Sequence, residues 1–117
     1  MKKNPIVFLR HILESIEWIL RDTENLSEID FIQNVPIQDA VIRRIEIIGE
    51  AAHNLPEEFK KAHPESPWQD ISDTRNKLIH EYFDLDLELI WEVVKKDIPP
   101  LREHILLLLK EANQPKQ

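Results

Sequence analysis

The stretch PIQDAVIRRIEIIGEAAHNL, residues 36–55, decides the fold class of this chain. Its apolar side chains recur every three or four residues, so that in an α-helix they fall on one side. These side chains are Ile37, Val41, Ile45, Ile48, Ala52 and Leu55. Pro36 suits the first turn of a helix, and the helix is expected to stop before Pro56 because proline cannot continue it.

Capping signals on either side of this stretch predict further helices. The expected N-caps, whose side chains bond the free backbone N–H groups of a first turn, are Asn4, Ser27, Ser66 and Asp86. The predicted helices span residues 5–25, 28–32, 57–63, 68–82 and 87–112. Pro99-Pro100 is expected to kink or break the last one. Long helices joined by short connections pack as an antiparallel bundle, which here would contain four main helices plus short ones.

The composition agrees with one all-α domain over residues 1–117. The chain contains eight Pro and one Gly, which leaves little material for hairpins or glycine-rich phosphate loops. That glycine, Gly49, lies inside a predicted helix, where it costs about 1 kcal/mol relative to alanine. The expected reason is the close approach of another helix, and a functional reason is the alternative. Trp18, Trp68 and Trp91 are expected to be core aromatic residues.

Charge and cysteine content exclude several function classes. A net charge of -7 argues against a general nucleic-acid coat, although it leaves room for a small basic site. Without cysteine there is no disulfide framework and no thiolate metal site. The first residues do not resemble a signal peptide, and no apolar run approaches the roughly 18 residues of a membrane span. The cytoplasm is therefore the expected location.

Two arginines stand where the apolar pattern requires an aliphatic side chain. Arg75 lies in the middle of a stripe formed by Trp68, Ile71, Leu78, Ile79 and Tyr82. Arg44 similarly interrupts the stripe of residues 36–55. A guanidinium in such a place is costly unless a carboxylate pairs with it or it is held for a ligand. Two interpretations stay open at this point: an ion pair with Glu46 or Glu50, and an anion-binding site.

His80 favours the second interpretation. It follows Arg75 by five residues and shares a polar strip of the predicted helix with Asn76 and Asp73. Because the unperturbed pKa of histidine lies near neutrality, His80 is a candidate general acid or base. The alternative is an ordinary surface histidine. Tyr82 would place a phenol near this site, or would simply be the last core aromatic of its helix.

The pattern Arg75-x4-His80-x-Tyr82 resembles the signature of HepT-type toxins, a branch of the HEPN ribonucleases. The segment IEIIGEAA, residues 45–52, resembles the central helix of that family. Further positions that fit the family are Trp68, Asp84-Leu85-Asp86, Trp91 and Asp97-Ile98-Pro99. The resemblance covers nearly the whole chain. It implies an HEPN-like helical bundle that homodimerises, so that two motifs face one cleft, and that cuts RNA there without a metal or cofactor.

The resemblance also implies roles for individual residues. Arg75 and His80 would be catalytic, with the ribose 2′-OH of the RNA as the attacking group. Supporting or RNA-binding residues would be Arg44, Asp73, Asn76 and Lys77. A minimal nucleotidyltransferase antitoxin would transfer AMP from ATP to Tyr82. The added bulk and negative charge beside Arg75 would then block the cleft.

Two alternatives do not require catalysis. In the first, the chain is a helical binding subunit that holds a nucleotide or phosphate for a partner nucleotidyltransferase. In the second, it is a purely structural dimer with a buried Arg–Glu network. A requirement for His80 in RNA cleavage would separate the ribonuclease from both.

Overall fold

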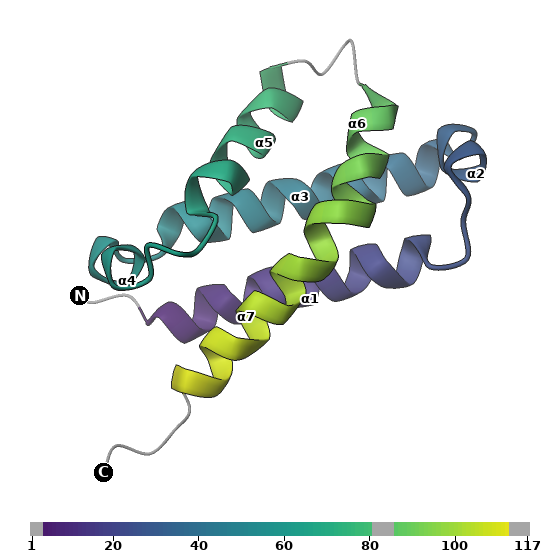
Figure 1. Ribbon diagram of the computed structural model, residues 1–117. Coiled ribbons are helices and arrows are strands. Elements are labelled where there is room, and N and C mark those ends of the chain that lie inside the picture. Colours follow the sequence, from purple (N-terminus) through teal and green to yellow (C-terminus); the bar gives the residue numbers. More distant parts are fainter. Residues whose placement is uncertain (1–3, 81–85, 113–117) are drawn as a thin grey trace.

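The computed structural model describes residues 4–80 and 86–112, and for residues 78–80 it describes the backbone alone. Within these residues the regular elements are helices and none is a strand (Figure 1). The prediction of an all-α antiparallel bundle is therefore confirmed. None of the helices in these two ranges is long and apolar enough to cross a membrane.

The first four helices are α1 (Pro5–Thr23), α2 (Glu28–Ile32), α3 (Val35–Asn54) and α4 (Glu57–Ala62). Of these, α1 and α2 begin at the expected capping residues Asn4 and Ser27. Asn4 Oδ1 accepts a hydrogen bond of 3.0 Å from the first turn of α1. Ser27 and Asp30 each accept a hydrogen bond of 3.1 Å from the other's backbone N–H, which forms a capping box. α3 begins one residue earlier than predicted, because Asn34 is its cap and accepts a hydrogen bond of 3.1 Å from Ile37.

The remaining elements are α5 (Trp68–His80), α6 (Leu87–Glu92), η1 (Val93–Asp97) and α7 (Ile98–Ala112). Asp86 caps α6 as predicted, since its Oδ1 accepts a hydrogen bond of 3.0 Å from Leu89 N–H. α5 follows α4 and packs on α3, and the run from α6 to α7 passes in front of α3 and then of α1 in the view of Figure 1.

The expected break at Pro99-Pro100 takes the form of a π-helical segment. η1 joins α6 to α7 directly, and Ile98 N–H donates to the carbonyl oxygen of Val93, five residues back. Each proline lacks an N–H donor, and its ring clashes with the carbonyl four residues earlier in an α-helix. The wider π turn before the prolines relieves this clash, so the helical run continues through them.

The hydrophobic core lies between α1, α3 and the run from α6 to α7. Its fully buried members include Leu9, Ile12, Ile16, Ile19, Phe31, Val41, Ile90 and Ile105. Burying one aliphatic side chain of this size contributes roughly 1.5–3 kcal/mol to stability. This core fixes α3 in the bundle, and α3 in turn provides the surface on which α5 packs.

The tryptophans differ in burial, which corrects one expectation. Trp68 is buried, and Trp91 is half-buried, with its ring centroid 5.3 Å from that of Phe31. Trp18 was expected in the core, but 39% of its surface is exposed. α1 directs its fully buried Ile16 and Ile19 inward. Position 18 therefore lies on the outer side of the helix.

Candidate functional site

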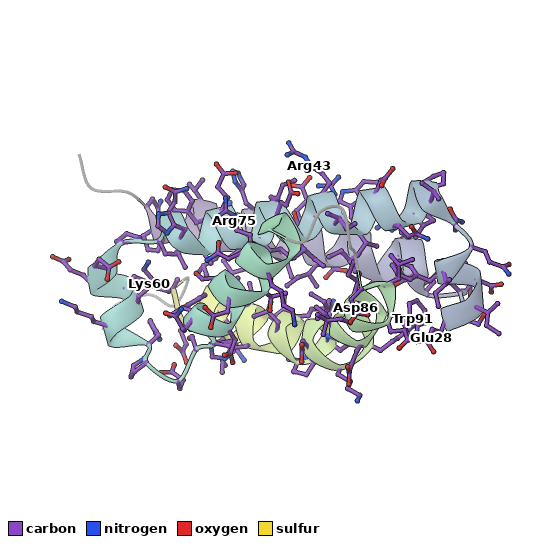
Figure 2. The ribbon with its side chains drawn as sticks, turned by 90° about the horizontal axis from the view of Figure 1, so that it is seen from above. Glu28, Arg43, Lys60, Arg75, Asp86 and Trp91 are labelled. Atoms are coloured by element: carbon purple, nitrogen blue, oxygen red, sulfur yellow. The ribbon has the colours of Figure 1, made fainter. Side chains whose placement is uncertain are left out.

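The side chain of Arg75 on α5 lies against Gly49 of α3. Figure 2 shows Arg75 beside α3. A Cβ atom built on Gly49 would lie 2.6 Å from Cδ and 2.7 Å from both Cβ and Cγ of Arg75. The backbone φ of Gly49 is not positive, so space rather than backbone conformation requires glycine here. The predicted close approach of another helix is confirmed, and the aliphatic stem of Arg75 is the part that approaches.

The guanidinium of Arg75 has little to bind within the described residues. Its Nε atom is buried and has no hydrogen-bond partner among them. Its Nη1 atom donates a long hydrogen bond of 3.5 Å to Asn76 Oδ1. Arg75 does not form the ion pair with Glu46 or Glu50 that the sequence left open. Instead, Glu46 Oε2 lies 4.0 Å from Arg43 Nη1. Within the described residues, the contact with Asn76 is therefore the hydrogen bond that this guanidinium makes.

His80 is the last residue of α5. Five residues separate it from Arg75, which corresponds to about 7.5 Å along the helix axis and about 140° around it. The side chain of His80 and the whole of Tyr82 lie outside the described residues. Their roles as acid–base group and modification site stay predictions.

The supporting residues of α5 take different positions. Asn76 contacts Arg75, as described above, and Lys77 is exposed. Asp73 is exposed and accepts a hydrogen bond of 2.8 Å from Gln69 Nε2. Asn76 is thus the predicted supporting residue that the structure places on Arg75.

A groove of about 650 Å³ lies between α5 and the run from η1 to α7, with α3 as its floor. Ile45 and Ile48 form the apolar floor, and the titratable lining residues are Glu65, Asp70, Asp73, Lys96, Asp97 and His104. Arg75 is not among the lining residues. This lining contains four carboxylates and one lysine, which disfavours binding of the phosphates of a nucleic acid. The groove is therefore not the anion-binding site, despite its size.

Metal binding finds no support among the described side chains. They contain no group of three or more His, Asp or Glu side chains that could share a metal ion. Within the groove, His104 Nε2 lies 2.6 Å from Ser66 Oγ and ties α7 to the start of α5. This histidine has a structural contact that accounts for its position.

Arg44 lies on the other side of α3, against Trp18 of α1. Its Cζ atom is 5.6 Å from the centroid of a Trp18 ring, and Cζ of Arg21 is 5.0 Å from one. Neither arginine forms an ion pair with another described residue. Neither the role of Arg21 nor the exposure of Trp18 was predicted from the sequence. The spacing of these two residues, one helical turn apart on α1, was the available signal.

The family of the chain follows from comparison with known proteins. The model of the ribonuclease HepT-like family matches residues 12–108. A probable ribonuclease HepT from Thermococcus cleftensis is 45% identical, over 87% of this chain and 93% of that protein. A candidate RNase from Caldanaerobacter subterraneus is 39% identical, over 93% of this chain and 97% of that protein. The chain belongs to the HepT-like ribonuclease family.

One relative is longer than this chain. A Methanocaldococcus jannaschii protein, named as a gamma-glutamylcyclotransferase and candidate RNase, is 51% identical over 99% of this chain. The chain spans only 52% of that protein's length. No solved structure matches the chain.

Proposed function

We propose that this chain is a metal-independent RNA endonuclease that acts as a homodimer in the cytoplasm. The observation that carries the proposal is Arg75: its stem is packed on Gly49, and its buried Nε has no partner among the described residues. A guanidinium held in place with free N–H groups suits a phosphate. Membership of the HepT-like ribonuclease family supports RNA as the source of that phosphate.

The proposed reaction is an internal transfer at phosphorus. His80 removes the proton from the ribose 2′-OH, and the 2′-oxygen attacks the adjacent phosphorus atom. Arg75 donates hydrogen bonds to the phosphate oxygens as negative charge builds on them. The bond from phosphorus to the 5′-oxygen then breaks, and His80 of the partner subunit protonates that oxygen. DNA lacks the 2′-OH and cannot react by this route.

RNA beyond the reacting phosphate would contact the cluster formed by Trp18, Arg21 and Arg44. An exposed aromatic ring with unpaired guanidinium groups offers stacking to bases and charge to phosphates. Arg44 and Gly49 belong to the same helix and are about 7.5 Å apart along its axis. The cluster therefore lies within reach of a strand whose scissile phosphate sits at Arg75.

Regulation is proposed through a second protein, a minimal nucleotidyltransferase antitoxin. It would transfer AMP from ATP to the hydroxyl of Tyr82, releasing pyrophosphate and leaving the enzyme silent as the toxin of a toxin–antitoxin pair. Tyr82 lies two residues beyond the end of α5. The AMP phosphate on Tyr82 is proposed to compete with RNA for the guanidinium of Arg75.

The catalytic part is tested with purified chain and a mixed-sequence single-stranded oligoribonucleotide. The products are expected to end in a 2′,3′-cyclic phosphate, EDTA should leave the rate unchanged, and His80→Ala should lower it by about 10²–10⁴-fold. A rate that EDTA abolishes and magnesium restores would contradict the mechanism. Binding without any cleavage by the wild-type chain would favour the non-catalytic subunit.

The regulatory part is tested with the nucleotidyltransferase, ATP and magnesium. Mass spectrometry should find one or more AMP groups on Tyr82 of the wild-type chain, with loss of cleavage. Tyr82→Phe should stay active after the same incubation. AMP on another residue alone, or silencing of the Tyr82→Phe protein, would remove Tyr82 from the proposal.

A further inference from the structure

Gly49 controls where the guanidinium of Arg75 can lie. Three consecutive stem carbons of Arg75 fall within 2.6–2.7 Å of the point that a Cβ on Gly49 would occupy. One of them is the arginine's own Cβ, which is attached directly to the backbone of α5. A rotation of the side chain alone cannot move that atom away. A methyl group at position 49 would therefore displace α5 from α3, the Arg75 side chain from its rotamer, or both.

The same contact restricts the conformations open to the Arg75 stem. A side chain with four rotatable bonds ordinarily samples many rotamers at a helix surface. Here the stem lies against the bare backbone of α3, and Nε is buried at its end. The guanidinium is thus held before any ligand arrives, and such preorganisation is worth most for a group that stabilises transition-state charge.

We infer that Gly49 is a positioning residue for RNA cleavage, acting through Arg75. The inference rests on the proposed function for its consequence in cleavage, but the contact itself can be measured separately. A purely structural role for Gly49 would affect folding stability without a specific effect on Arg75 or on kcat.

The first measurement follows the Arg75 Nε–H group by NMR, with Arg75→Lys used to assign its signal. In the wild-type chain this proton should exchange with water several-fold more slowly than that of the exposed Arg43. Gly49→Ala should remove the difference. Glu50→Ala is the matched control, because it places alanine at the neighbouring, exposed position of α3 and adds no atom near Arg75. Slow exchange that persists in Gly49→Ala would overturn the inference.

The second measurement is cleavage of the oligoribonucleotide. Gly49→Ala should lower kcat by about 10²-fold with little change in KM, since a displacement of about 1 Å suffices for such a loss. Glu50→Ala should cleave like the wild type. Loss of the slow exchange with normal kcat would overturn the positioning role. An Arg75→Ala protein as active as the wild type would overturn the ribonuclease role of Arg75, and the exchange measurement would still report on the contact.

A double variant covers the case in which Gly49→Ala does not fold. In Gly49→Ala/Arg75→Ala the Cγ and Cδ atoms are gone but the Cβ atom at position 75 remains, so thermal stability should recover in part relative to Gly49→Ala alone. Its residual cleavage should equal that of Arg75→Ala. A double variant that cleaves still more slowly than Arg75→Ala would mean that Gly49 acts by another route, and would overturn the inference.

Discussion

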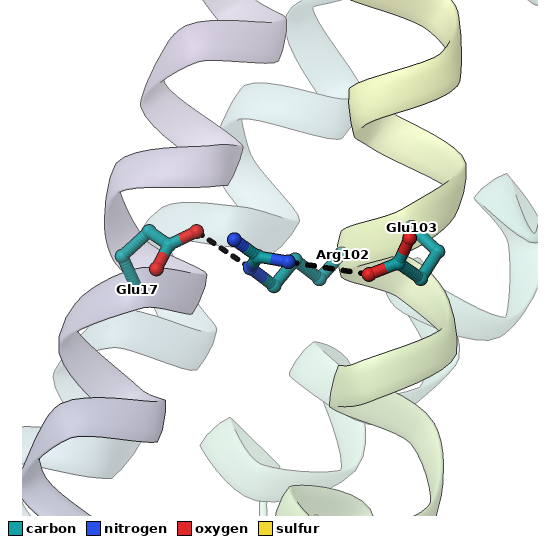
Figure 3. Close-up of polar contacts among 3 residues, drawn as sticks. All are labelled: Glu17, Arg102 and Glu103. Carbon is teal, nitrogen blue, oxygen red and sulfur yellow. Dashed lines mark hydrogen bonds and ion pairs between the residues drawn. The ribbon is translucent and has the colours of Figure 1, made fainter.

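Arg102 and Arg75 occupy opposite kinds of environment in the same bundle. Arg102 on α7 donates from Nε to Glu17 Oε1 of α1 at 2.7 Å and from Nη1 to Glu103 Oε1 at 3.2 Å (Figure 3). The hydrogen bond to Glu17 raises the pKa of Arg102 further above its usual range. Arg75 forms no hydrogen bond to a carboxylate of the described residues, and its hydrogen bond to Asn76 is long.

Arg102 links two helices, whereas Arg75 forms no ion pair with the described residues and is the candidate for binding a ligand. Arg102 is partly exposed and its pairs are at the surface, where solvent screens them and each contributes little to stability. A buried donor left without a partner costs about 1–3 kcal/mol. An isolated protein gains nothing from that cost, whereas the cost is expected where a guanidinium is held in a fixed position for a phosphate. The unpaired arginine is therefore the better candidate for function.

Truncating the two arginines should give the largest contrast. Arg75→Ala should lower the cleavage rate by about 10²–10³-fold, the usual effect of removing one donor to a developing oxyanion. Its thermal stability should stay the same or rise, because a buried unpaired group has been removed. Arg102→Ala should keep normal cleavage. Initial rates and calorimetry on both proteins measure this, and equal losses of activity would abolish the contrast.

The sequence predicted the helices well because their signals are local. Asn4, Ser27 and Asp86 act on the next three residues, so their capping roles could be inferred without knowledge of the tertiary structure. The anomalies at Gly49 and Arg75 were likewise visible as breaks in local patterns. That the two anomalies are one contact was not predictable, because helical spacing gives the direction of a side chain but not the helix that it meets.

The remaining site features depend on that tertiary arrangement. The sequence left an ion pair to Glu46 or Glu50 open, whereas Glu46 lies beside Arg43 and Arg75 stays unpaired within the described residues. The exposure of Trp18 depends on which side of α1 meets α3 and α7. Arg44 was recognised as unusual, but its aromatic partner comes from another helix and could not be read from its own.

Substitutions in the cluster of Trp18, Arg21 and Arg44 should have an effect of intermediate size, on RNA binding rather than on the rate of the chemical step. Trp18→Ala is expected to raise KM several-fold with kcat unchanged, because it removes a stacking surface away from the scissile phosphate. Arg44→Ala should reduce the slope of log affinity against log salt by about 0.7, the value for one contact with single-stranded nucleic acid. Fluorescence anisotropy with a labelled oligoribonucleotide measures both effects. Leu107→Ala, an exposed site on α7, is the control, and equal effects there would exclude a specific role for the cluster.

The smallest effect is expected at the paired arginine. Glu17→Gln keeps the size of the side chain but removes the charge that Arg102 binds, so the thermal midpoint should fall slightly at low salt. In about 1 M salt the difference from the wild type should vanish, because exposed charges are then screened within a few ångströms. Because the hydrogen bond to Glu17 raises an already high pKa, Arg102 stays charged at every pH at which the protein is folded, and salt is the informative variable. Calorimetry at both salt concentrations measures the pair. A large loss of stability that persists in high salt would mean that the Arg102–Glu17 pair stabilises the fold far more than its exposure suggests. The contrast between a surface pair at Arg102 and a buried group at Arg75 would then not hold.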